Sequence, residues 1–214
     1  LLERQSNPTI APLATPQGVT LRLTAKAATL EQANQLILPV EEEIRNAVGE
    51  FLYGVNEETL AGRLFEMLVQ HQLTIAAAES LTAGLFTATL ADVPGTSQVL
   101  AGGLTVYSLQ EKAKQLGIDE EELSQHGVVS EWCAKAMARQ VQKKFSSSIG
   151  VGLTGVAGPD PLEGQSVGTV WLGFAIEDEV FAERVQLSGL RQTIREKSVQ
   201  HAYLRLIQYL KERH

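Results

Sequence analysis

Residues 73–92 read LTIAAAESLTAGLFTATLAD. The first part, LTIAAAE, is short and mostly apolar, and this pattern predicts a buried strand. The second part, LTAGLFTATLAD, predicts a helix, so a strand passes into a helix at ESLTAG. In sheets built from such units, ligands bind at the carboxyl ends of the strands, where helix N-termini expose amide donors. Ser80 and Thr82 lie at this junction and could hold an anion or an oxyanion there. From these residues alone, capping of the helix is the preferred interpretation.

Strands and helices continue to alternate toward the C-terminus. The segments 101–108 and 148–155 are predicted strands, and 108–117 and 130–145 are predicted helices. Two further strands, GTVWLGFAIED and EVFAERVQL, are joined by a short acidic turn and predict an antiparallel hairpin before a final helix. We therefore expect an α/β fold of the α+β mixed-sheet type: a helix-covered mixed sheet with a C-terminal hairpin and helix.

The first 55 residues predict a smaller unit. Residues 1–17 contain three prolines and are expected to be extended or irregular, whereas VTLRLTAKA (19–27) predicts a half-buried strand. Thr29 and Gln32 form a capping-box pattern that opens a helix, and FLYGV (51–55) predicts a short closing strand. We expect a β-α-β domain over residues 1–55 and a second domain over residues 56–214.

Composition and charge limit the possible functions. The chain has 214 residues, of which 44% are hydrophobic and 20% charged, as in ordinary globular proteins. The net charge of −7 argues against a broad nucleic-acid surface, which needs clustered Lys and Arg. The single cysteine, Cys133, excludes an intrachain disulfide framework and a cysteine-rich metal site, and its helical pattern predicts an inert buried thiol.

The sequence also bears on location and cofactors. No apolar run approaches the ~20 residues that cross a bilayer, and the start lacks the order of a signal peptide. We therefore expect a cytoplasmic protein without a membrane partner. No histidine has a neighbour at metal-ligand spacing, so neither a metal nor a cofactor is expected. The first residue, Leu1, is not an initiator Met, so a piece of a longer chain is expected.

The stretch TVYSLQEK (105–112) supplies a second candidate for chemistry. Ser108 followed by Glu111 is a capping-box pattern, which makes Ser108 the expected N-cap and Tyr107 the last strand residue. Lys112 then lies about one turn into the helix, where the helix dipole and partial burial both lower the pKa of an amine. A neutral lysine can serve as the base of a serine nucleophile. From the residues alone, a solvated surface lysine like Lys114 is the preferred interpretation.

Two further segments could contact a ligand. The stretch 153–169, LTGVAGPDPLEGQSVGT, contains four glycines that permit close backbone approach, and Thr154 adds a hydroxyl at a strand end. A plain glycine-rich turn is the alternative. In LSGLR (187–191), Arg191 lies near the start of the last helix, and an arginine there suits a phosphate. A solvated arginine is the alternative.

With these segments in order, the chain resembles the CinA (competence/damage-inducible protein) family. The matching motifs are AAAESLTAG, GGLTVYSLQEKAKQLGI, HGVVSE, LTGVAGPDP with VGTVW, and LSGLR, over about residues 57–211. SNPTIAPLA with VTLRLTAKA resembles the KH-like middle domain of the longer CinA proteins, over about residues 1–55. In those proteins a domain similar to molybdopterin-binding proteins comes first, so the resemblance implies that such a domain is missing here.

The resemblance implies that the second domain is a nicotinamide-nucleotide amidase. Such an enzyme hydrolyses the carboxamide of nicotinamide mononucleotide to nicotinate mononucleotide and ammonia, in pyridine-nucleotide salvage. Ser80 is then the nucleophile, Lys112 its base, and Tyr107 relays or orients the proton. The implied substrate-binding residues are Ser97 (in PGTSQ), Thr154, Gly155, Thr82 and Arg191, with Arg191 on the phosphate and Thr82 also capping the helix. A homodimer is implied as well.

Two residues depart from the family pattern, and two other classes of function stay open. Ala83 replaces a glycine of ESLTGG, which matters only where φ is positive, and Leu109 replaces a polar residue of YSNEAK. One alternative is a non-catalytic module that binds nucleotides or regulates. The other is an interaction protein linked to competence or DNA recombination. Nucleic acid is not expected as a partner, because the chain is acidic and residues 1–55 lack a GXXG loop.

Overall fold

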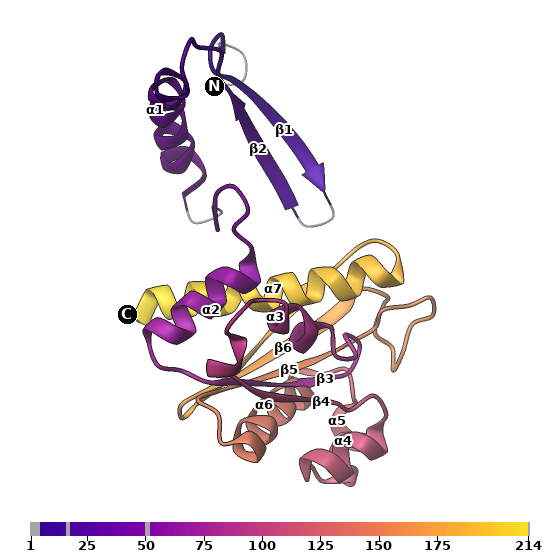
Figure 1. The fold of residues 1–214 in the computed structure, drawn as a ribbon. Helices are drawn as coiled ribbons and strands as arrows, with labels where there is room; N and C mark the ends of the chain where they lie inside the picture. Colours follow the sequence, from indigo (N-terminus) through magenta and orange to yellow (C-terminus); the bar gives the residue numbers. More distant parts are fainter. Residues whose placement is uncertain (1–4, 16–17, 50–51, 214) are drawn as a thin grey trace. The chain divides into compact units, whose positions relative to one another are not determined.

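The chain divides into two compact units, Leu1–Asn56 and Glu57–His214. The computed structural model describes residues 5–15, 18–49 and 52–213, shown in Figure 1. The domain boundary expected after residue 55 lies one residue before this division.

The first unit consists of a hairpin and a helix. Strands β1 (Thr9–Thr15) and β2 (Gly18–Thr24) pair antiparallel, and α1 spans Leu30–Val48. The predicted cap of α1 is confirmed, because Thr29 Oγ1 accepts a hydrogen bond of 3.2 Å from the Gln32 amide.

The element order of the first unit differs from the prediction. Residues 9–15, expected to be extended or irregular, are extended and form strand β1. The closing strand expected at 51–55 is absent over 52–55, and residue 51 lies outside the described residues. The element order is thus β-β-α. Because only two residues separate β1 from β2, the two strands pair as an antiparallel hairpin, without the helical crossover of a β-α-β unit.

The second unit contains a five-stranded mixed sheet in the order β4-β3-β5-β6-β7. The strands β3 (Ile75–Glu79), β4 (Leu100–Thr105) and β5 (Ile149–Gly155) run parallel, with β3 between the other two. Strands β6 (Thr169–Ile176) and β7 (Glu179–Gln186) form an antiparallel hairpin, and β6 pairs antiparallel with β5. The predicted mixed sheet with a C-terminal hairpin is confirmed.

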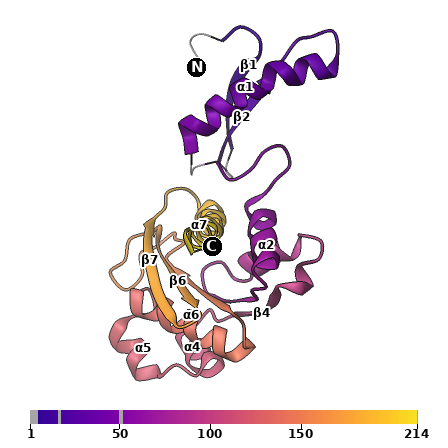
Figure 2. The same cartoon turned by 90° about the vertical axis from the view of Figure 1, so that its left-hand side faces the viewer.

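Helices cover both faces of this sheet, as Figures 1 and 2 show. One face packs against α2 (Leu60–Gln70), α3 (Leu85–Ala91) and α7 (Arg191–Arg213). The other packs against α4 (Leu109–Leu116), α5 (Glu120–His126) and α6 (Glu131–Phe145). Among the described helices, none combines the length and apolarity needed to cross a bilayer.

The strand residues divide between two cores because side chains alternate along a strand. Ile75 and Ala77 join the core under α2, α3 and α7, whereas Ala76 and Ala78 join the core under α4 to α6. The predicted burial of Cys133 in the second core is confirmed, and burial raises the pKa of its thiol to about 11.

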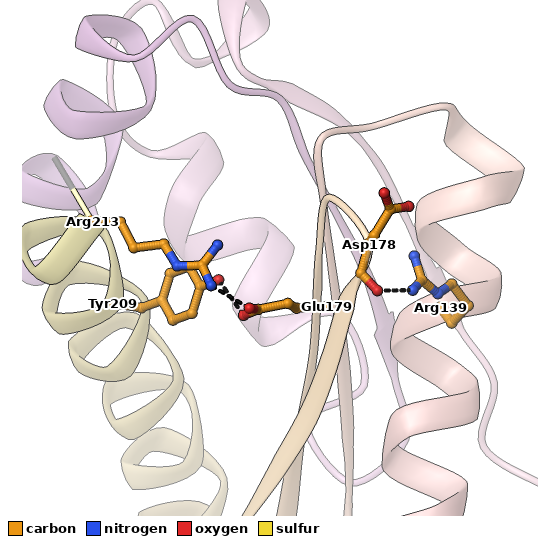
Figure 3. Close-up of polar contacts among 5 residues, drawn as sticks. All are labelled: Arg139, Asp178, Glu179, Tyr209 and Arg213. Carbon is orange, nitrogen blue, oxygen red and sulfur yellow. Dashed lines mark hydrogen bonds and ion pairs between the residues drawn. The ribbon is translucent and has the colours of Figure 1, made fainter.

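The β6–β7 turn is held from both faces of the sheet, as Figure 3 shows. Arg139 of α6 donates a hydrogen bond of 2.6 Å to the backbone oxygen of Asp178. On the α7 side, Tyr209 donates one of 2.8 Å to the Glu179 carboxylate, which also pairs with Arg213. The start of β5 pairs with the end of β6, so this clamp lies at the amino end of β5. The candidate site lies at the opposite end.

Candidate active site

The structure brings Ser80 and Lys112 together. Ser80 directly follows β3, and its amide donates a hydrogen bond of 2.9 Å to Leu153 in β5, which extends the strand register. Its side chain therefore faces the same side as Ala76 and Ala78, toward α4 to α6. Lys112 Nζ donates a hydrogen bond of 3.0 Å to Ser80 Oγ. The strand end and the α4 helix thus place a hydroxyl and an amine within proton-transfer distance.

Lys112 is a buried amine rather than a solvated one. Only 1% of its surface is exposed, so the interpretation preferred from the residues alone was wrong. Burial lowers the pKa of Lys112 below its usual value, and electrostatic interactions with Cys133 and Glu163 partly oppose this shift. The second hydrogen bond of its ammonium goes to the backbone oxygen of Tyr107, at 3.3 Å. Because both hydrogen-bond acceptors of the amine are uncharged oxygens, neither strongly favours the protonated form.

The start of α4 is as predicted, and this determines where Lys112 points. Ser108 Oγ accepts a hydrogen bond of 3.1 Å from the Glu111 amide and caps the helix. Leu109, the first residue of α4, packs against the core on this face, so the departure from the family pattern serves packing. Lys112 lies one turn further on the helix and reaches Ser80 from there.

The helix after Ser80 begins later than predicted, and Thr82 does not cap it. Helix α3 starts at Leu85, and its N-cap is Gly84. The Thr82 hydroxyl is buried and has no hydrogen-bond partner in the described structure. The role of cap falls to the Glu79 carboxylate, which accepts hydrogen bonds from the amides of Phe86 at 3.0 Å and Thr87 at 2.9 Å.

Glu79 was missed in the sequence because a cap is normally sought within three residues of the helix start. Here the carboxylate comes from the end of the preceding strand and also accepts a hydrogen bond of 2.6 Å from Thr87 Oγ1. A negative charge at the positive end of the helix is electrostatically favourable. As a consequence, the amides of Phe86 and Thr87 at the start of α3 already donate to Glu79 and cannot hold an oxyanion.

The turn between Ser80 and α3 contains a strained residue. Ala83 has φ 49°, in the left-handed region, where a side chain costs roughly 1–2 kcal/mol. This is the position at which the family pattern has glycine, so the substitution falls where positive φ is required. The Ala83 amide donates to Ser80 O at 3.1 Å and closes the turn.

Arg195 of α7 contacts the same turn and was not predicted from the sequence. Its Nε donates to Leu81 O at 2.9 Å, and its Nη2 donates to Thr82 O at 2.7 Å. The residue lies one helical turn after Arg191, and only the tertiary packing of α7 directs its guanidinium to this backbone.

Tyr107 and Arg191 contact each other at the same end of the sheet. Strand β4 ends at Thr105, so Tyr107 lies beyond the strand, and 55% of its surface is exposed. Arg191 donates hydrogen bonds of 2.6 Å to the Tyr107 hydroxyl and 2.6 Å to Gly158 O. The Tyr107 hydroxyl is therefore directed to Arg191, and only its backbone oxygen contacts Lys112. This geometry does not favour a proton relay through the hydroxyl.

Thr154 and Gly155 lie at the end of β5, beside Ser80, and both have structural contacts. Thr154 Oγ1 donates a hydrogen bond of 2.6 Å to Val128 O. A Cβ at Gly155 would lie 2.7 Å from Thr169 O, so the pairing of β5 with β6 requires glycine there.

Ser97 is not brought to this site. It lies in a 3-10 turn before β4, at the amino end of the parallel strands, whereas Ser80 follows the carboxyl end of β3. The expectation that Ser97 shares a site with Ser80 in one chain does not fit this geometry. In a parallel pair, the residue before one strand and the residue after its neighbour lie at opposite edges.

A separate cavity of about 440 Å³ lies on the α5–α6 side of the sheet. Its lining includes His126, Glu163, Trp171 and Arg184, but none of the predicted site residues. Its connection to the candidate site is through Glu163, which also acts electrostatically on Lys112.

The chain matches known families over both units. Residues 57–210 match the CinA C-terminal domain, and residues 1–54 match the Damage-inducible protein CinA KH domain. A competence-damage inducible protein of Lysinibacillus sphaericus is 50% identical over 214 residues, covering 100% of this chain and 51% of the relative. One of Bacillus cytotoxicus is 46% identical over 213 residues, covering 99% and 52%. The chain spans about half the length of these curated relatives.

Solved structures resemble the fold as well. The CinA superfamily protein of Enterobacter cloacae has a TM-score of 0.68 and 30% identity, covering 74% of this chain and 96% of that one. The competence damage-inducible protein A (ComA) of Klebsiella pneumoniae has a TM-score of 0.71 and 26% identity, covering 72% and 97%. The ordered motifs, the family matches and these relatives agree that the chain belongs to the CinA family, with a CinA C-terminal domain preceded by a CinA KH domain.

Proposed function

We propose that the unit Glu57–His214 is an amidase that hydrolyses nicotinamide mononucleotide to nicotinate mononucleotide and ammonia. The observation that carries this proposal is the 3.0 Å contact between Ser80 Oγ and Lys112 Nζ, made by a lysine that is 1% exposed. A buried amine with a lowered pKa is what a serine nucleophile needs as its base. The choice of substrate follows from the resemblance of the motifs to nicotinamide-nucleotide amidases.

Acylation begins with Lys112 in its neutral form. The amine accepts the Ser80 proton while Oγ bonds to the carboxamide carbon, and the carbonyl electron pair moves to the oxygen. The Lys112 ammonium then donates its proton to the amide nitrogen as the carbon–nitrogen bond breaks. Ammonia leaves, and the nicotinate group remains as an ester on Ser80.

Deacylation repeats these steps with water. Lys112, neutral again, accepts a proton from the water that attacks the ester carbon. The proton returns to Ser80 Oγ as the ester bond breaks, and nicotinate mononucleotide is released. One amine therefore serves as base and acid in both halves of the reaction.

Arg191 supplies a site for the substrate phosphate in this proposal. Its guanidinium is exposed, and its hydrogen-bond acceptors among the described residues are the uncharged oxygens of Tyr107 and Gly158. The positive charge of Arg191 can therefore pair with a phosphate. The hydrogen bond to the Tyr107 hydroxyl orients the guanidinium. Binding energy gained at the phosphate holds the carboxamide near Ser80 without taking part in the chemistry.

The experiment is an assay of the purified chain with nicotinamide mononucleotide, measuring ammonia and the acid product. Ser80→Ala is expected to abolish both products while the protein stays folded. Ser124→Ala is the matched control, because this exposed serine lies on α5 and donates its hydrogen bond to Glu120 O of the same helix. Full activity in Ser80→Ala contradicts the mechanism. Calorimetric binding of the nucleotide without ammonia release favours the non-catalytic binding module instead.

A further inference from the structure

One guanidinium holds two consecutive backbone oxygens of the turn that follows Ser80. We propose that Arg195 is a positioning residue that fixes the Thr82 amide as the oxyanion donor beside Ser80. The proposal rests on the proposed amidase function for its substrate, but its geometry concerns any acyl or phosphoryl group attacked by Ser80.

The direction of the Thr82 amide follows from the two contacts of Arg195. Its Nε and Nη2 bind Leu81 O at 2.9 Å and Thr82 O at 2.7 Å, so both carbonyl groups point toward α7. The carbonyl of Leu81 and the amide of Thr82 belong to one trans peptide, in which the two groups point in opposite directions. The Thr82 N–H therefore points away from α7, toward the face on which Ser80 Oγ meets Lys112.

A count of the backbone amides in this turn supports the assignment. Most are already bonded: Ser80 to Leu153 O, Ala83 to Ser80 O, Leu85 to Thr82 O, and both Phe86 and Thr87 to the Glu79 carboxylate. The amides of Leu81, Thr82 and Gly84 have no such partner among the described residues, and of these three only the Thr82 amide shares a peptide group with a carbonyl that Arg195 holds. The Thr82 hydroxyl is also buried and without a partner there. Buried amides are nearly always paired, so an unpaired one beside a nucleophile suits a substrate oxygen.

The two contacts of Arg195 are needed because the turn after Ser80 is strained. Ala83 has φ 49° without being glycine, and the amides of α3 that could have bound an oxyanion are taken by Glu79. Without Arg195, the peptide between Leu81 and Thr82 is free to rotate and turn its N–H away from the substrate. Loss of one oxyanion donor lowers turnover by roughly 10²–10³-fold.

A purely structural role is the competing explanation, since Arg195 also joins α7 to the segment before α3. The test therefore measures the reaction of Ser80 itself, with a fluorophosphonate in place of the substrate. Ser80 Oγ bonds to phosphorus, fluoride leaves, the Ser80 proton passes to Lys112, and the phosphoryl oxygen occupies the oxyanion position. The rate of Ser80 labelling is followed by mass spectrometry in the full chain.

Three variants are compared with the wild type. Arg195→Ala is expected to slow labelling roughly a hundredfold or more. Arg195→Lys, whose ammonium is a single point charge, is expected to recover part of this loss. Arg205→Ala is the matched control, because Arg205 lies on the same helix and contacts Glu183 and the Phe181 ring instead. Its labelling rate is expected to stay within about twofold of the wild type. Added methylguanidine is expected to accelerate labelling of Arg195→Ala but not of Arg205→Ala.

Each outcome decides the matter. Wild-type labelling rates in Arg195→Ala overturn the proposal. So does a slow rate that comes with an equal loss of affinity for ribose 5-phosphate, because this fragment lacks the carbonyl group that Ser80 attacks and an oxyanion donor does not contact it. If Arg195→Ala does not fold, Arg195→Lys replaces it in the same comparison. If the wild type is labelled but releases no ammonia from the nucleotide, the amidase function fails and Arg195 is still judged by the labelling rates. An unlabelled wild type overturns both.

Discussion

Glu79→Gln is the substitution whose effect on stability follows most directly from the structure. The carboxylate is 1% exposed and accepts three hydrogen bonds from Phe86 and Thr87 at the start of α3. Glutamine retains one oxygen, which can keep the two contacts with Thr87. Its amide nitrogen then faces the Phe86 N–H, so a donor meets a donor.

The magnitude follows from these contacts. An unsatisfied buried amide costs about 1–3 kcal/mol, and loss of the negative charge at the helix start costs about 0.3–1 kcal/mol more. We therefore expect the free energy of unfolding to fall by about 2–3 kcal/mol. For a unit of this size, that lowers Tm by roughly 5–10 °C.

Tryptophan fluorescence is the appropriate assay. Both tryptophans, Trp132 and Trp171, lie in the second unit, so the signal reports unfolding of that unit in the intact chain. The matched control is Glu66→Gln, whose surface ion pair with Arg63 is worth at most about 1 kcal/mol. A Tm for Glu79→Gln within about 1 °C of the wild type refutes the assignment of Glu79 as the helix cap.

The remaining predictions concern the site. Lys112→Met is expected to lower kcat far more than it changes KM, and steady-state kinetics showing the reverse would make Lys112 a binding residue. In the wild type, kcat/KM is expected to fall as the pH drops through the pKa of Lys112, because only the neutral amine accepts a proton. Burial lowers this pKa below 10.5. A pH profile in which kcat/KM begins to fall only at or above pH 10.5 contradicts the burial argument. Arg191→Ala is expected to raise KM for nicotinamide mononucleotide but not for nicotinamide riboside, and an equal rise for both places Arg191 away from the phosphate. Ala83→Gly relieves the strain of φ 49°, and thermal unfolding is expected to show a stabilisation of up to about 1 kcal/mol, whereas destabilisation would contradict the left-handed conformation.

Arg191 and Arg195, in the first two turns of α7, show how the candidate site is assembled from both faces of the sheet. Ser80 and Lys112 meet on the face covered by α4 to α6, whereas Arg191 and Arg195 come from the helix on the other face. They reach the site because α7 begins at the edge where β3 ends, which lets its first two turns contact Gly158 and the turn after Ser80. A single helix thus supports both the proposed phosphate site and the proposed oxyanion donor.

The sequence alone determined the order of the strands in the second unit and the caps that depend on near neighbours. Thr29, Ser108 and the acidic hairpin turn act over a few residues, so their patterns carry the information in full. The mixed sheet, its C-terminal hairpin and the burial of Cys133 were predictable for the same reason. The local pattern did not predict the partner of β2. It indicated a closing strand at 51–55, whereas β2 pairs with β1 in a hairpin.

Only the tertiary structure decided the contacts made across long stretches of chain. Lys112 looked like a solvated residue because its burial depends on the packing of α4 against α6, which no local pattern records. Glu79 caps a helix from the preceding strand, and Arg195 reaches a turn more than a hundred residues earlier. Ser97 was misplaced because strand direction decides which loops share an edge of the sheet. The physical reason is common to all four: burial and hydrogen bonding depend on which surfaces meet in space, whereas a sequence pattern records only neighbours along the chain.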